Sequence, residues 1–338
     1  MKSCFHYLLF LLSSIVLNSC SNDLEALAKY EETASVYALL DPRQAYQFVK
    51  INKVFINPGS KATDIARISD SIFFDTLAPQ LVELDNGSVR QVIPLTRANI
   101  LLKDSGTFAN SPNYLYVTNK PVSSLYQYRL EVKLPKTNKL VTATTNMVTM
   151  PVASLSQPIL VFQIPRIINI PTTPNGNIAI SFTSGMNGKI YDAFFNFNYQ
   201  EISKADTSQK TVKTIRWKIL RSYRTIKDKG NENVIQRIPS SLFYNMLLNE
   251  IPVNPGVTRH FLPCSIELIG GNQELDNYIQ ASVPSIGIVQ KQTEYTNIKG
   301  GIGLFASRNT LFIDEVHLIS TNKSYIINDP LLKPLGFQ

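Results

Sequence analysis

Residues 190–200 read Ile-Tyr-Asp-Ala-Phe-Phe-Asn-Phe-Asn-Tyr-Gln, and residues 212–219 read Val-Lys-Thr-Ile-Arg-Trp-Lys-Ile. In both stretches apolar side chains recur at every second position, which is the period of a β-strand with one buried face. The two stretches therefore predict a long antiparallel pair whose aromatic face points into a core. The side chains expected on that inward face are Ala193, Phe195, Phe197, Tyr199, Ile215, Trp217 and Ile219.

Hairpin patterns are repeated in the N-terminal half of the chain. Residues 81–84 and 89–93 are apolar strands that flank Asn86-Gly87, a pair that favours the positive φ angles of a tight hairpin turn. Residues 125–134 alternate cleanly, and residues 140–145 follow as their expected partner. Short strands separated by turns are typical of a β-sandwich of immunoglobulin-like size. We therefore predict a mostly β protein with two immunoglobulin-like β-sandwich domains.

The chain divides at a segment rich in proline, because proline removes the backbone donors that a central strand needs. Two stretches near 240–249 and 272–282 have helical spacing, so the second domain is expected to carry one or two short helices. The predicted organisation is a signal peptide (1–19), a lipidated tether (20–33), an N-terminal β-sandwich (34–147), a Pro-rich linker with edge strands (148–176), a second β-rich domain (177–320) and a tail (321–338).

The N-terminus resembles a bacterial lipoprotein signal. Lys2 precedes an apolar run that ends at Leu17, and Asn18-Ser19-Cys20 follows it. This pattern predicts that Cys20 becomes the lipidated first residue of a mature chain of 319 residues (338 minus 19). The alternatives are an ordinary secretory signal and a signal anchor, although an uncleaved span needs about 20 apolar residues and this run is shorter.

The net charge of +8 is concentrated in one region. Residues 201–237 contain ten Lys and Arg against four Asp and Glu, and several of the cations lie on the outward face of the predicted strand. The first interpretation of this charge is a solvated strand face. If it is a binding surface on an anchored envelope protein, anionic lipopolysaccharide, an anionic glycan or an acidic partner loop fits it better than nucleic acid does. The residues expected to form an anionic-contact face are Arg216, Lys218, Arg221 and Arg224.

Sequence patterns for catalysis are weak. Cys264 is the one cysteine left after lipidation and is expected to be a small buried residue, while His260 and His317 lie in separate segments without metal-binding spacing. Residues 300–303 read Gly-Gly-Ile-Gly but lack the Lys-Ser/Thr of a phosphate-binding loop. We therefore predict no catalytic residues, no cofactor and no metal site.

Three further stretches carry a family resemblance. They are Leu39-Leu40-Asp41-Pro42 with residues 48–53, the aromatic pair within 190–219, and residues 297–305. Together with the lipoprotein signal they resemble a domain-of-unknown-function family of lipoproteins from the Bacteroidota outer membrane. The family is commonly associated with TonB-dependent receptors of nutrient uptake, so the resemblance implies a non-catalytic binding or accessory module at the outer membrane.

The resemblance also implies a lipid-anchored location, surface-exposed rather than facing the periplasm, although the acids after Cys20 are few (Asp23 and Glu25). Two alternatives belong to other functional classes. One is a hydrolase that acts on glycan or peptide in a cleft between the domains, with paired carboxylates from distant segments. The other is an adhesin-like or envelope-assembly subunit.

Overall fold

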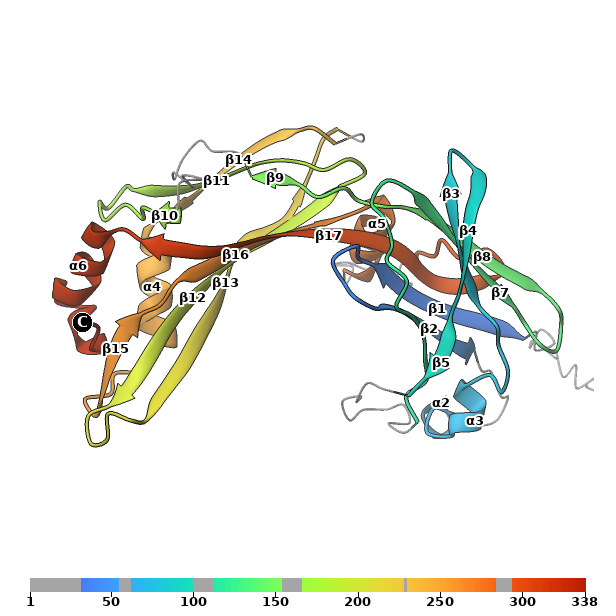
Figure 1. Ribbon diagram of the computed structural model, residues 1–338, viewed down its shortest axis with the longest axis horizontal. Coiled ribbons are helices and arrows are strands. Elements are labelled where there is room, and N and C mark those ends of the chain that lie inside the picture. Colours follow the sequence, from blue (N-terminus) through green and yellow to red (C-terminus); the bar gives the residue numbers. More distant parts are fainter. Residues whose placement is uncertain (1–31, 55–61, 100–111, 154–165, 228–229, 284–293) are drawn as a thin grey trace, which may run out of the picture.

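A computed structural model describes residues 32–54, 62–99, 112–153, 166–227, 230–283 and 294–338. It confirms a mostly β protein, with 50% of the described residues in strands and 15% in helices. Figure 1 shows two β-rich lobes joined by one long strand, β17 (Gly301–Leu318). No helix among the described residues combines the length and the apolar character needed to cross a lipid bilayer.

Two sheets enclose the core of the N-terminal lobe. One contains β1, β2, β6 and β5, and the other has the order β4-β3-β7-β8. Their inward residues form one apolar cluster that includes Val36, Ile51, Leu130 and Phe305. The elements are β1 (Thr33–Leu40), β2 (Gln47–Val54), α2 (Ala62–Ile65), α3 (Ser69–Ile72), β3 (Gln80–Asp85), β4 (Ser88–Pro94), β5 (Thr96–Ala98), β6 (Leu115–Thr118), β7 (Gln127–Lys133) and β8 (Leu140–Asn146).

The predicted hairpins of this lobe are present. β3 pairs antiparallel with β4 across Asn86 and Gly87, whose φ angles are 48° and 84°. These positive angles explain why Asn-Gly occupies the turn, since both residues tolerate the left-handed region. β7 and β8 also pair antiparallel, as the alternation in residues 125–134 predicted.

The C-terminal lobe is built on the predicted aromatic strands. β12 and β13 pair antiparallel over most of their length, and the inward aromatic residues of β12 are buried against helix α4. Phe195 and Phe197 each meet the ring of Phe243 edge to face, at centroid distances of 6.0 and 5.8 Å. The elements are β9 (Val152–Ala153), β10 (Arg166–Ile168), β11 (Asn177–Thr183), β12 (Ile190–Ser203), β13 (Lys210–Arg224), β14 (Asn233–Pro239), α4 (Ser241–Glu250), β15 (Val257–Phe261), β16 (Cys264–Gly271), α5 (Gln273–Ser282), α6 (Ser320–Asn328) and the 3₁₀ turn η1 (Lys333–Leu335).

The pairing of strand β17 differs from the predicted domain organisation. Its first part, residues 301–307, pairs in parallel with β1 of the N-terminal lobe, and its later part pairs with β16 of the C-terminal lobe. The predicted second domain (177–320) is therefore wrong at this strand, which completes both lobes. Local alternation identifies a strand but carries no information about which distant strands lie beside it, so the sequence pattern could not reveal the sharing.

The predicted tail is also wrong for residues 321–338. Helix α6 occupies most of the first half of this segment, and Leu332, Leu335 and Phe337 are buried in the core of the C-terminal lobe. The sequence does not indicate this packing, because the apolar residues of the segment are scattered among polar residues and prolines without a clear period. The predicted helices near 240–249 and 272–282 correspond to α4 and α5.

Candidate binding groove beside an edge strand

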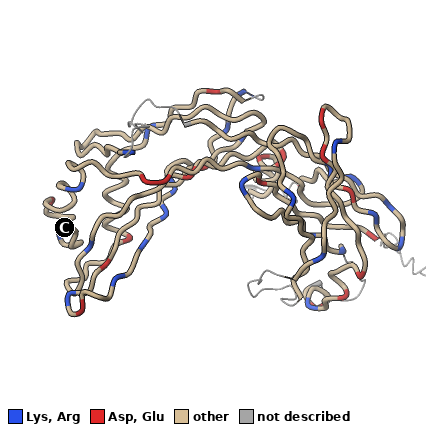
Figure 2. Tube along the Cα trace, in the orientation of Figure 1, with Lys and Arg blue, Asp and Glu red and all other residues tan. Residues whose placement is uncertain are grey.

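Strand β13 ends the largest sheet of the protein. Over the residues that the structure places, it pairs with β12 and with no other strand. Its fifteen residues contain six Lys and Arg and no acid. Figure 1 shows its lower part as the outermost strand of the C-terminal lobe, and Figure 2 shows the Lys and Arg residues along it. Charged side chains are a common device for keeping such an edge from pairing with other chains by chance.

The alternation of β13 places two of the predicted contact residues on the sheet face that points away from α4. There Arg216 Nη2 lies 2.7 Å from Glu267 Oε2, and Lys218 Nζ lies 2.6 Å from Asp192 Oδ2. The Arg216 guanidinium also stacks over the ring of Phe194, with Cζ 3.4 Å from the ring centroid. These two cations are therefore engaged within the protein.

The other two predicted residues have different surroundings. Arg224 Nε lies 2.7 Å from Asp276 Oδ1, a carboxylate that is almost completely buried. Arg221 forms no ion pair with any described residue. The structure thus brings Arg216 and Lys218 together, pairs Arg224 with helix α5, and leaves Arg221 as the one member of the predicted set without an acidic partner.

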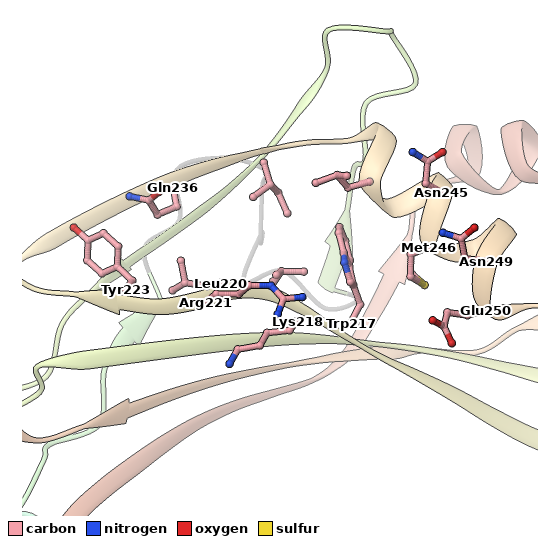
Figure 3. Close-up of a pocket in the computed structure, with 13 residues that line it drawn as sticks. Trp217, Lys218, Leu220, Arg221, Tyr223, Gln236, Asn245, Met246, Asn249 and Glu250 are labelled. Atoms are coloured by element: carbon pink, nitrogen blue, oxygen red, sulfur yellow. The ribbon is translucent and has the colours of Figure 1, made fainter. Parts of the chain in front are cut away.

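Two adjoining hollows of about 600 and 590 Å³ lie between β13 and α4. Both are lined by Trp217, Arg221, Met246 and Glu250, so we treat them as one site and call it the Trp217 groove. In Figure 3, Trp217 rises from β13 toward α4, whose residues Asn245, Met246, Asn249 and Glu250 form the facing wall. Gln236 and Ile238 of β14 close the groove at one end. Tyr199 and Glu201 of β12 line it at the other end.

Trp217 is half-buried, whereas the sequence predicted a core residue. The predicted parity is correct, because Ile215, Trp217 and Ile219 all pack on the core cluster of the C-terminal lobe. The Trp217 ring contacts that cluster through Phe243, at a centroid distance of 6.0 Å. Its burial is incomplete because β13 is the last strand of the sheet, so the outer side of the ring faces the groove.

Two cations without acidic partners lie on the groove side of β13. Lys213 is opposite Tyr199 in the β12–β13 register and lines the groove with Arg221. In the described part of the chain, neither side chain forms an ion pair. Two carboxylates line the same groove. Glu201 is bound by the guanidinium of Arg259, with Nη2 and Nε at 2.7 and 2.9 Å from Oε1, while Glu250 ends helix α4.

The groups that could perform other chemistry are dispersed. Among the described residues, no three His, Cys, Asp or Glu side chains are close enough to hold a metal ion. His317 lies 3.6 Å from Glu315 at the surface, and His260 contacts Gln338 near the C-terminus. Cys264 is buried, as the sequence predicted, and its burial raises the pKa of the thiol to about 11. Such a thiol is almost entirely protonated at neutral pH and is a poor nucleophile.

The α4 wall of the groove was missed from the sequence. Asn245 and Asn249 are four residues apart, and this spacing put both on one helix face beside Met246 and Glu250. The polar stripe was a usable signal, but nothing in the sequence showed that this face lies opposite Trp217. Cys20, the predicted lipid site, lies outside the described residues.

Comparison with known proteins gives no further assignment. No model of a known protein family matches this chain, and no curated protein matches it.

Proposed function

We propose that this chain is a lipid-anchored binding module of the outer membrane that holds a partner or ligand in the Trp217 groove and performs no catalysis. The observation that carries the proposal is the groove itself. A half-buried indole, two cations without acidic partners and several amide side chains converge on a hollow large enough for a sizeable ligand.

The surroundings of the groove carboxylates support a binding role. A glycosidase needs two carboxyl groups that exchange protons with substrate or water. Glu201 instead accepts two hydrogen bonds at Oε1 from the fully buried Arg259, so this carboxylate is held by the protein itself. Glu250 is then the one groove carboxylate without such a fixed partner. A single carboxylate cannot be both the general acid and the base or nucleophile of a glycosidase.

The anchoring part of the proposal rests on Cys20 and is tested by substitution. We expect Cys20→Ala to be released from the membrane fraction or to accumulate with its signal attached, because no other residue can carry the lipid at that position. Cys264→Ala is the matched control, since it removes a buried cysteine that has no role in anchoring. Membrane retention of a correctly cleaved Cys20→Ala protein would contradict the proposal.

The partner part follows from the family resemblance, which implies an association with a TonB-dependent transporter. It is tested by placing a photo-crosslinking amino acid at Leu242, an exposed residue that lines the groove, in cells that produce the lipidated protein. We expect one dominant adduct that contains a transporter. The same amino acid at Lys133, on the N-terminal lobe, is the control. Adducts that form at Lys133 but not at Leu242 would show that the groove is not the contact.

A further inference from the structure

Three side chains of β13 line the groove at intervals of four residues: Lys213, Trp217 and Arg221. The interval from Lys213 to Trp217 is regular strand, in which four residues span about 13 Å. Between Trp217 and Arg221 the β12–β13 pairing shifts from Phe194↔Lys218 to Ala193↔Leu220, so β13 has an extra residue there and its alternation is interrupted. The groove therefore presents one cation on each side of a central indole ring.

The same spacing occurs naturally in an extended peptide. Side chains at positions i, i+4 and i+8 of a strand point to one side, and the first interval equals the distance between Lys213 and Trp217 in β13. A peptide with acids at both ends and an apolar residue in the middle would match Lys213 and Trp217 in one continuous register, and its second acid would lie near Arg221, beyond the bulge. Glu250 on the opposite wall would repel the acids from α4 and so favour the β13 side.

The free edge of β13 supplies the second half of the recognition. An edge strand presents unpaired N–H and C=O groups at alternate residues, and an extended peptide can satisfy them by adding as one more strand. The first five residues of β13 are all exposed, which leaves this part of the edge open. A glycan could stack on Trp217 but would make no use of the backbone edge.

We propose that an extended, acidic segment of a partner protein adds to β13 as an extra strand, with its central apolar side chain on Trp217 and its acids on Lys213 and Arg221. This inference rests on the proposed binding function and specifies the chemistry of the partner.

The direct test uses a synthetic nine-residue peptide, Asp-Thr-Ser-Thr-Phe-Thr-Ser-Thr-Asp, with blocked termini. Trp217 is the one tryptophan of the chain, so its fluorescence reports on the groove without a label. We expect a saturable change in emission that weakens as salt is raised, because exposed charges are screened. A control peptide with Lys in place of both Asp residues should give no saturable change. Equal binding of the two peptides would overturn the proposal.

Backbone methylation separates strand addition from docking by side chains alone. In an added strand, alternate peptide N–H groups point toward β13 and the others point to solvent. Two peptides are therefore compared, one N-methylated at the odd positions and one at the even positions. We expect one set to abolish binding and the other to leave it nearly unchanged. Equal effects of both sets would contradict strand addition.

Charge reversal tests the two cations. We expect Lys213→Glu combined with Arg221→Glu to weaken binding of the acidic peptide by about tenfold or more, since each contact changes from attraction to repulsion. Lys120→Glu combined with Lys133→Glu is the matched control, because both residues are exposed and belong to the other lobe. Equal affinity of the two double variants would overturn the assignment.

Failure of this inference is distinguishable from failure of the proposed function. A groove that crosslinks to a partner in cells, yet ignores the acidic peptide, would exclude the peptide class and keep the binding role. Saturable binding of an anionic oligosaccharide such as oligogalacturonate, without peptide binding, would identify a glycan site instead. A groove that neither crosslinks nor binds either probe would exclude both proposals.

Discussion

The guanidinium of Arg259 and the carboxylate of Glu201 form an ion pair that fastens the C-terminus to the sheet beneath the groove. Arg259 is fully buried, and it also donates hydrogen bonds to the backbone carbonyls of Leu335 and Pro252. One side chain thus connects β12, the segment after α4 and the end of the chain.

Loss of this arginine should destabilise the protein strongly. We expect Arg259→Met to lower the free energy of unfolding by about 3–5 kcal/mol, because Glu201 and two carbonyls lose their partner. Glu201→Gln should cost less, since the neutral amide can still accept a hydrogen bond. Urea denaturation measures both. A cost below about 1 kcal/mol for Arg259→Met would show that the C-terminus is held by other contacts, of which Phe337 is the first to test.

The partial exposure of Trp217 determines how far Trp217→Ala should lower the free energy of unfolding. The sequence predicted an inward-facing core residue, and truncation of a fully buried tryptophan to alanine costs about 3–5 kcal/mol. With one side of the ring open to the groove, we expect about 1–3 kcal/mol instead, because less apolar area is lost from the core. Iodide should quench the fluorescence of the folded protein appreciably. An unquenched, blue-shifted emission would mean that the ring is fully enclosed.

Tyr191 occupies a space that glycines leave open. The ring is fully buried, its Oη accepts a hydrogen bond from the N–H of Gly185 at 3.0 Å, and burial raises the pKa of the hydroxyl to about 12. A Cβ at Gly270 would lie 2.6 Å from the ring, and one at Gly188 would overlap the hydroxyl oxygen. The tyrosine therefore has no room to accommodate a larger neighbour.

Alanine at either glycine should destabilise the C-terminal lobe. We expect Gly188→Ala and Gly270→Ala each to lower the free energy of unfolding by about 1–3 kcal/mol through overpacking. Gly256→Ala is the control, because its Cβ would meet only the end of the Asn254 side chain, at 3.2 Å. The free energy of unfolding of this control should lie within about 0.5 kcal/mol of that of the parent protein. Similar values for all three variants would argue against a tight cradle.

The thiol of Cys264 should make stability fall at alkaline pH. Burial raises the pKa of the folded thiol from its ordinary value of 9.0 to about 11. Folding thus favours the neutral thiol, so this contribution is fully present below pH 9 and is lost as pH rises through about 11, up to roughly 3 kcal/mol. The measurement is the difference in unfolding free energy between the parent and Cys264→Ala at pH 8 and pH 11. A constant difference would show that the thiol ionises equally well in both states.

Sequence patterns predicted correctly those strand faces and turns that depend on interactions between neighbouring residues. The alternation of Phe195 and Phe197 identified the inward face of β12, and Asn86-Gly87 identified a hairpin turn. Each of these features depends on neighbours within a few residues, so the pattern carries enough information. The outward direction of Arg216 and Lys218 followed from the same period.

The partners of those residues depend on distant segments and could not be predicted. Arg216 meets Glu267 across 51 residues, and Arg224 meets Asp276 across 52. The pairing of these cations changes which of them can contact a ligand, and it leaves Lys213 and Arg221 on the groove side of the strand. A charge count along the sequence treats all six cations of β13 alike, so it overstates the basic face and misses the groove.

Strand β17 also dictates when the N-terminal lobe can finish folding. The chain is synthesised from its N-terminus, but β1 lacks its parallel neighbour until residues 301–307 have emerged. The ion pair between Arg308 and Asp41 closes over 267 residues, a separation that slows folding and leaves strand edges exposed in the meantime. A chain that stops before residue 301 would therefore leave two unfinished lobes rather than one intact and one missing. During synthesis, the earliest part of the protein is thus the part that stays incomplete longest and depends most on chaperones.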